Sequence, residues 1–141
     1  LMKQTRKNQK GFTLIEILIV LALIATMGSY VGVKIIAQMQ RGRIDATKIQ
    51  ISGFQQALQA FYLDCNAYPT SGQGLAALLS KPSVGKACEK YAEGGYIDKK
   101  QIPKDPWGNE YQYECEDGQN FTIYSIGKDS TPGTEDDVKV E

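Results

Sequence analysis

The chain has 141 residues, of which 16 are basic and 16 acidic, and it contains no histidine. Four basic residues and no acidic residue precede Gly11, so the chain from Phe12 onward carries 12 basic and 16 acidic residues, a net charge of −4. This charge, without a basic patch interleaved with aromatic side chains, argues against nucleic acid as a partner, and the lack of histidine and of a recognisable catalytic motif argues against an enzyme or a zinc site.

An apolar run follows the basic N-terminal segment. Between Phe12 and Val33, a stretch of 22 residues, the one strongly polar residue is Glu16. As a helix this stretch is about 33 Å long, enough to span a bilayer. The preceding basic residues are Lys3, Arg6, Lys7 and Lys10. The positive-inside rule predicts that this end stays in the cytoplasm and that the rest of the chain lies in the periplasm.

Glu16 needs an explanation, because a carboxylate at the centre of a bilayer costs about 2.5–3.5 kcal/mol on insertion scales. One interpretation is an isolated acid near the lipid headgroups that reaches water. The other is a carboxylate that waits for a positive partner. Cleavage of the chain after Gly11 would provide such a partner, the free α-amine of Phe12.

The helical pattern continues beyond the apolar run. Apolar residues recur every seven positions in two series, Ile44, Ile51, Leu58 and Thr47, Phe54, Phe61. Such a stripe is typical of a helix with one buried face. We therefore expect a single helix from Phe12 to about Leu63, roughly 78 Å long, half membrane anchor and half spine of a soluble domain. Within the anchor, Gly28 and Gly32 indicate either close helix packing or a loosened helix.

The remaining predicted elements are short. They are a helix stop at 64–69, a second helix around Leu75–Leu79, an irregular segment at 83–104, a hairpin of 110–114 with 121–125, and a polar loop at 127–141 with a short strand at 138–140. Together they predict an α+β fold, in which one long N-terminal helix packs on a small antiparallel sheet.

Three cysteines allow three choices of one disulfide and one free thiol. An oxidising periplasm favours such a bond. We expect Cys88–Cys115, because both residues fall in the sheet-and-loop region, whereas Cys65 falls near the end of the long helix.

Two loops contain candidate binding residues. The first, Asp105-Pro106-Trp107-Gly108-Asn109, is either a platform with an exposed indole or a structural turn, and we expect the turn. In the second, acidic side chains gather within nine residues, at Asp129, Glu135, Asp136 and Asp137. Carboxylates and carbonyls on a flexible backbone suit calcium, but the spacing is not that of an EF-hand, and these residues alone favour a solvated acidic tail.

The hexapeptide Gly11-Phe12-Thr13-Leu14-Ile15-Glu16 before an apolar helix resembles the processing site of type IV prepilins and of type II secretion pseudopilins. The resemblance implies that a prepilin peptidase cuts between Gly11 and Phe12 and methylates the new N-terminus of Phe12. It also implies that Glu16 meets the Phe12 amine of a neighbouring subunit during assembly.

Further motifs occur in the order typical of the major pseudopilin family of type II secretion. They are Tyr68-Pro69-Thr70, Gln73-Gly74-Leu75, Gly94-Gly95-Tyr96-Ile97, Asp105 to Asn109, and Gly127-Lys128-Asp129 with Pro132 to Asp137. In that family the last loop binds Ca²⁺. The resemblance implies ligands from the side chains of Asp129, Asp136 and Asp137 and from the backbone carbonyls of Ile126 and Thr131.

The resemblance also implies a pilin-like fold and a function. The expected organisation is a cytoplasmic leader at 1–11, a transmembrane or fibre-core helix at 12–33 and a periplasmic domain at 34–141. The chain would polymerise with itself into the pseudopilus that helps drive folded exoproteins through the outer membrane. Its expected partners are the prepilin peptidase, an inner-membrane assembly platform, minor pseudopilins and the inner membrane itself. The alternative is the major subunit of a type IV pilus.

Overall fold

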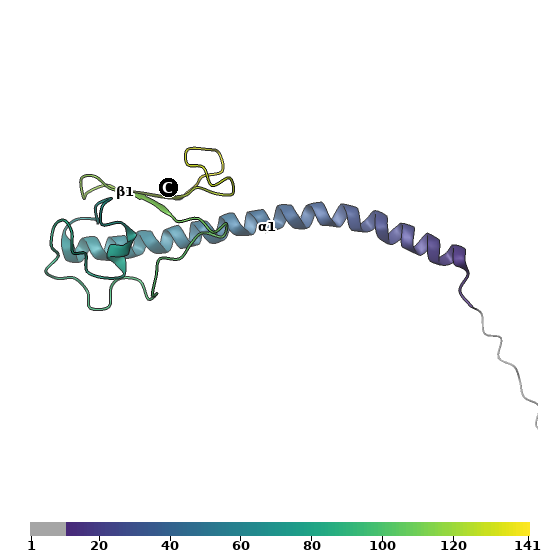
Figure 1. The fold of residues 1–141 in the computed structure, drawn as a ribbon, viewed down its shortest axis with the longest axis horizontal. Helices are drawn as coiled ribbons and strands as arrows, with labels where there is room; N and C mark the ends of the chain where they lie inside the picture. Colours follow the sequence, from purple (N-terminus) through teal and green to yellow (C-terminus); the bar gives the residue numbers. More distant parts are fainter. Residues whose placement is uncertain (1–10) are drawn as a thin grey trace, which may run out of the picture. The chain divides into compact units, whose positions relative to one another are not determined.

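The computed structural model describes residues 11–141. The basic residues Lys3, Arg6, Lys7 and Lys10, on which the predicted cytoplasmic location of the N-terminus rests, lie outside the described residues. The chain forms two compact units, one ending at Gln40 and the other spanning Arg41–Glu141. Its elements are the helix α1 (Leu14–Cys65), the 3-10 helix η1 (Leu75–Leu78) and the strands β1 (Gln112–Glu114), β2 (Thr122–Ser125) and β3 (Val138–Lys139) (Figure 1).

The first unit contains the N-terminal part of α1. Every residue from Gly11 to Met39 is exposed, although most of these side chains are apolar. By length and composition α1 can cross a membrane. Thr13 directly precedes the helix, and its hydroxyl accepts a hydrogen bond from the Glu16 amide at 3.4 Å. Thr13 therefore occupies the N-cap position and Glu16 the third helical position, the spacing of a capping box.

In the second unit, the C-terminal part of α1 forms one side of the core. Its buried residues are Thr47, Ile51, Phe54, Ala57, Leu58 and Phe61. This confirms the predicted stripe except at Ile44, which is 36% exposed. The helix ends two residues later than expected, at Cys65, where Asn66 takes a positive φ of 56°. Asparagine is one of the few residues other than glycine that adopts this conformation readily.

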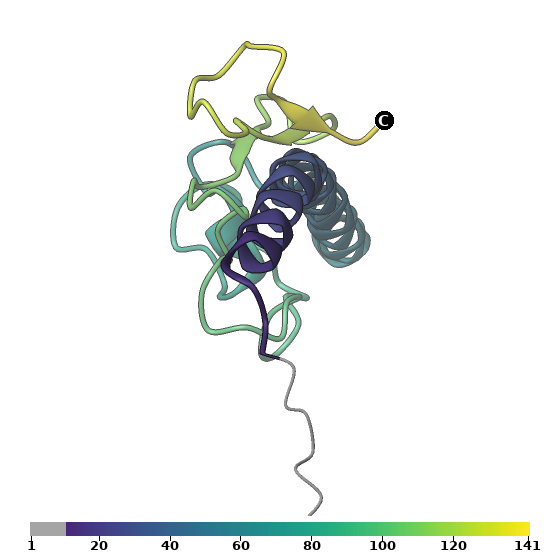
Figure 2. The same ribbon diagram turned by 90° about the vertical axis from the view of Figure 1, so that its right-hand side faces the viewer.

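The three strands form one antiparallel sheet in the order β1-β2-β3. Tyr113 pairs with Ile123, and Ser125 pairs with Val138. Figures 1 and 2 show the strands along one side of the C-terminal part of α1. Buried Ile123 and Tyr111 join the helix residues in the core, and the ring of Tyr111 meets that of Phe54 edge to face at 5.1 Å. The predicted fold class, a long helix packed on a small antiparallel sheet, is confirmed.

The segment between η1 and β1 contains no helix or strand from Ser80 to Tyr111, as expected for 83–104. It is nevertheless held against the core. The rings of Tyr91 and Tyr96 pack edge to face on Phe61, and the Tyr96 hydroxyl donates to Asp64 Oδ2 at 2.8 Å. The predicted second helix exists as the single turn of η1.

Candidate functional site

The predicted processing site lies in exposed chain just ahead of α1. Gly11 and Phe12 belong to no helix or strand, and Phe12 is 80% exposed. Exposed chain outside regular structure is where proteases act most readily. Glu16 lies in the first turn of the helix and is also exposed. The pairing of Glu16 with a Phe12 amine is predicted between two subunits, so it stays a prediction.

The acidic loop at 126–137 leaves the sheet after β2 and returns to it at β3. Its two limbs meet at Gly127, which has a φ of +66°. A Cβ atom at this position would lie 2.1 Å from the carbonyl oxygen of Asp136, so the close approach requires glycine. This contact brings the backbone at Ile126, whose carbonyl is a predicted calcium ligand, close to the backbone of Asp136.

The loop's carboxylates partly serve its own backbone. Asp129 Oδ1 accepts the Thr131 amide at 3.0 Å, and Asp137 Oδ2 accepts the Gly133 amide at 2.9 Å. Such bonds are typical of turns built by aspartate. The other oxygen of Asp137, Oδ1, is buried and has no hydrogen-bond partner. A buried carboxylate oxygen without a partner is costly, and a bound cation would satisfy it.

The predicted calcium ligands are only partly brought together. Within residues 11–141, no three acidic, cysteine or histidine side chains lie close enough to form a metal-binding group. Asp129 and Asp136 are exposed, whereas Asp137 is half-buried. The donor set still fits Ca²⁺ in kind, because it combines carboxylate and carbonyl oxygens on one loop and includes the unpartnered Asp137 oxygen.

The turn at 105–109 is a structural one, as expected, and the side chain of Asp105 accepts the hydrogen bonds that hold it. Asp105 is only 4% exposed, and its Oδ1 accepts the amides of Trp107 at 3.0 Å and Asn109 at 2.8 Å. Its Oδ2 accepts the hydroxyl of fully buried Ser125 at 2.5 Å. Trp107 is half-buried, and its indole Nε1 is buried without a partner. The turn is therefore bonded to the end of β2.

The same turn also reaches the acidic loop through Asn109. Its side-chain amide donates to the Gly127 carbonyl at 2.9 Å, and its Oδ1 accepts the Ser130 hydroxyl at 2.9 Å. Sequence reasoning did not identify Asn109 or Ser125 as site residues. The available signal was local only: an aspartate followed by proline and glycine indicates a turn whose carboxylate bonds nearby amides.

Tyr111 connects the turn region to α1. Burial and then the nearby Asp105 carboxylate raise the pKa of Tyr111 to about 12, because both disfavour a phenolate. The Tyr111 hydroxyl donates to Gln50 Oε1 at 2.5 Å. The phenol therefore stays protonated and holds the start of β1 against the helix at neutral pH.

The predicted Cys88–Cys115 disulfide is wrong. The structure joins Cys65 to Cys88, with Cα atoms 5.0 Å apart, and Cys115 is a buried free thiol. The physical reason is that α1 continues to Cys65, where Tyr91 and Tyr96 pack the irregular segment onto Phe61 and bring Cys88 to the helix end. Cys115 is held elsewhere, because its amide donates to the hydroxyl of Ser71.

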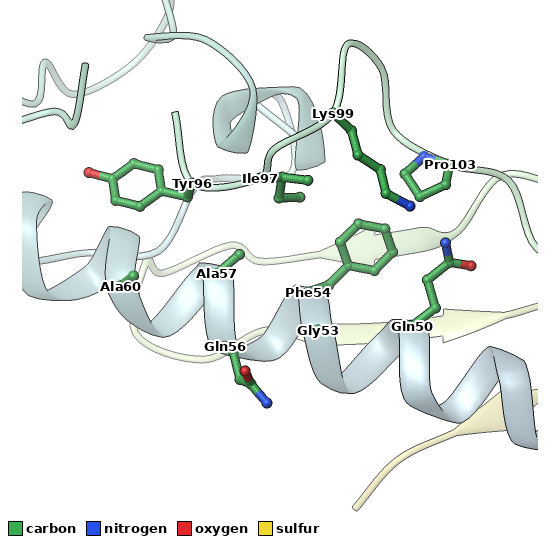
Figure 3. A pocket seen from close by; sticks show the side chains of 10 residues that line it. All are labelled: Gln50, Gly53, Phe54, Gln56, Ala57, Ala60, Tyr96, Ile97, Lys99 and Pro103. Atoms are coloured by element: carbon green, nitrogen blue, oxygen red, sulfur yellow. The ribbon is translucent and has the colours of Figure 1, made fainter. Parts of the chain in front are cut away.

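A hollow of about 380 Å³ lies between α1 and residues 96–103. Figure 3 shows Phe54 and Gln50 on the helix facing Ile97, Lys99 and Pro103 on the opposite wall. Most of the lining is apolar, and its titratable side chains are Lys99 and Tyr96. The hollow therefore lacks the paired acid and base, or activated nucleophile, of a typical catalytic site.

Two family models match the chain. The model described as "Type II secretion system (T2SS), protein G" matches residues 34–141, and the "Prokaryotic N-terminal methylation motif" matches residues 6–30. The first covers most of the chain, including the sheet, the turn at 105–109 and the acidic loop. The second covers the predicted cleavage site and the apolar part of α1.

Individual proteins agree with these models. The chain is 37% identical to the type II secretion system core protein G of Klebsiella michiganensis, over 94% of this chain and 93% of that protein. It is also 37% identical to core protein G of Vibrio cholerae, over 95% of this chain and 90% of that protein. The crystal structure of the major pseudopilin from the type 2 secretion system of enterohaemorrhagic Escherichia coli matches with a TM-score of 0.65 and 35% identity, over 72% of this chain and 85% of that chain.

Proposed function

The chain belongs to the type II secretion system protein G family, and we infer from this membership that it is a structural subunit of the pseudopilus, which assembles with itself and with the secretion machinery. The alternative, a major type IV pilin, is not favoured, because the family match extends over residues 34–141 rather than over the N-terminal helix alone. The apolar part of α1, most of which the methylation-motif model covers, would anchor the chain in the membrane.

The observation that carries the assembly function is the first part of α1. It is mostly apolar and exposed from Leu14 to Met39, and it carries one carboxylate in its first turn. A protein exposes this much apolar surface when lipid or another protein covers it. Before assembly the bilayer would cover it, and in the fibre the equivalent helices of neighbouring subunits would do so.

The steps that prepare the subunit follow from the same segment. A prepilin peptidase would cut the exposed bond between Gly11 and Phe12 and methylate the Phe12 amine. The leader at 1–11 would remain cytoplasmic, the helix at 12–33 would span the inner membrane, and the domain at 34–141 would face the periplasm. An inner-membrane assembly platform and minor pseudopilins would then add the subunit to the growing fibre.

Glu16 would select the position of the incoming subunit. In the apolar interior of a fibre, the attraction between the Glu16 carboxylate and a Phe12 ammonium group is strong, and leaving either one alone is costly. The pair would therefore act mainly on register and recruitment. The helix cap provided by Thr13 does not need this charge, since the capping bond runs to the Glu16 amide.

The test replaces Glu16 by glutamine, which keeps the size of the side chain and removes its charge. We expect Glu16→Gln to be processed normally, by mass spectrometry of the N-terminus, but to give few fibres in electron microscopy of sheared cells. Glu16→Asp, which keeps the charge, serves as the matched control and should retain more fibres. A normal fibre yield from Glu16→Gln would rule out the pairing.

Binding of Ca²⁺ by the 126–137 loop is also part of the proposal. The unpartnered Asp137 Oδ1 and the mixed donor set support it. At a free calcium concentration 100 times Kd, binding would stabilise the folded domain by about 2.7 kcal/mol. Calcium should therefore raise the melting temperature of a fragment of residues 34–141, EDTA should lower it, and Asp137→Asn should weaken the response. A melting temperature that changes with neither calcium nor EDTA would contradict calcium binding.

A further inference from the structure

We propose that Asn109 is a positioning residue for the acidic loop at 126–137: it holds the loop in its cation-binding conformation without binding the cation itself. This inference rests on the proposed binding of Ca²⁺ by the loop. It gives the turn at 105–109 a role that extends beyond its own stability. The supporting observations are the two side-chain bonds of Asn109 and the bonds that hold Asn109 in place.

The two bonds of Asn109 reach both parts of the first limb of the loop. The Asn109 side-chain amide donates to the carbonyl of Gly127, the residue directly after Ile126, and Asn109 Oδ1 accepts the hydroxyl of Ser130. Ser130 lies between Asp129 and Thr131, two predicted calcium ligands, and it has a positive φ of 55°. This conformation is uncommon for serine and needs support from its surroundings. Asn109 supplies that support from a segment 21 residues away.

The Ile126 carbonyl is oriented through the same turn. The peptide between Ile126 and Gly127 is planar and trans, so its C=O and N–H point in opposite directions. The Gly127 N–H donates to Ser125 Oγ at 3.1 Å, and Ser125 in turn donates to Asp105. The direction of the Ile126 carbonyl is therefore set by buried groups. Asn109 meanwhile occupies the next carbonyl, that of Gly127.

Asn109 is itself held by backbone bonds that do not depend on its side chain. Its amide donates to Asp105 Oδ1, and its carbonyl accepts the Asp105 amide at 2.9 Å. Asn109 is half-buried, so a smaller side chain leaves no large cavity. Asn109→Ala should therefore preserve the turn and remove only the two bonds to the loop. Loss of such outer contacts around a metal site typically weakens metal affinity by about 10–100-fold.

The experiment titrates the full chain in detergent micelles with CaCl₂ by isothermal calorimetry and measures its melting temperature in EDTA. We expect Asn109→Ala to raise the Kd for calcium about 10–100-fold while its melting temperature in EDTA stays within a few degrees of wild type. Ser130→Ala removes one of the two bonds and should raise the Kd less. The matched control is Asn120→Ala, which removes an asparagine that bonds Asp117 in the hairpin turn and should leave the Kd unchanged.

The possible failures are distinguishable. If wild type binds calcium and Asn109→Ala binds it with the same Kd, the positioning role is overturned and calcium binding stands. If Asn109→Ala mainly lowers the melting temperature in EDTA and keeps its Kd, the residue is only structural. Complete loss of binding in Asn109→Ala with an unchanged fold would make Asn109 a ligand, which also overturns the proposal. A wild-type chain that binds no calcium overturns both the calcium proposal and this inference.

Discussion

Breaking the Cys65–Cys88 disulfide is expected to lower the free energy of unfolding of the domain by about 3 kcal/mol. The bond joins residues 23 positions apart. On the chain-entropy model, closing a loop of this length restricts the unfolded chain by about 3.4 kcal/mol at 25 °C. For a domain of about 100 residues, each kcal/mol changes the melting temperature by roughly 4–8 °C, so the loss should exceed about 10 °C.

The measurement is thermal melting of a fragment of residues 34–141, followed by circular dichroism with and without reductant. This fragment contains all the buried core residues, since the core begins at Thr47. The double variant Cys65→Ala/Cys88→Ala should melt at the same temperature under both conditions. Cys115→Ala is the matched control, because it removes a buried thiol and keeps the bond. Its melting temperature should fall slightly, but its response to reductant should equal that of wild type.

Two results would refute this reasoning. If Cys115→Ala abolishes the response to reductant, Cys115 takes part in the bond, as the sequence had suggested. If reduction of wild type changes the melting temperature by less than about 3 °C, the entropic account is wrong. The aromatic contacts of Tyr91 and Tyr96 with Phe61 would then hold the irregular segment in place without the disulfide.

Three further predictions concern single residues. Because the pKa of Tyr111 is raised to about 12, the folded state favours the neutral phenol. The stabilisation by this phenol is complete below about pH 10 and is lost between about pH 10 and 12. If Tyr111→Phe shows the same alkaline denaturation as wild type, this prediction is wrong. Hydrogen bonds from Asn120 and Gln119 lower the pKa of Asp117 to about 2. The contribution of this carboxylate to stability is therefore present above about pH 4 and is lost as pH falls toward about 2. A titration midpoint of the Asp117 carboxyl near about 4, measured by NMR, would contradict this. Gly127→Ala should destabilise the domain by about 2 kcal/mol or more in urea denaturation, because a Cβ would overlap a carbonyl; an unchanged midpoint would exclude that clash.

Hydrogen bonds join the turn to the end of β2 and to the acidic loop, although the two motifs lie far apart in the chain. Asp105 and Ser125 are 20 residues apart, and Asn109 and Gly127 are 18 apart. Neither loop has regular structure, so each depends on side-chain bonds to keep its conformation. A change in the turn should therefore affect the acidic loop, although the turn contains none of the predicted calcium ligands.

The sequence by itself determined the features that depend on neighbours along the chain. Apolar residues that recur every seven positions predicted the soluble half of α1 and its buried face, with Ile44 as the one exception, and turn residues at 117–118 predicted the hairpin. These inferences succeed because helical period, strand alternation and turn chemistry are local properties of the backbone.

Only the tertiary structure decided which distant residues meet. Three cysteines have three equivalent pairings on paper, and packing of Tyr91 and Tyr96 on the end of α1 selects Cys65–Cys88. In the same way, the buried bond of Asp105 to Ser125 has no local signature. Such pairings depend on how helix, sheet and loops pack together, a long-range property that residue spacing does not encode.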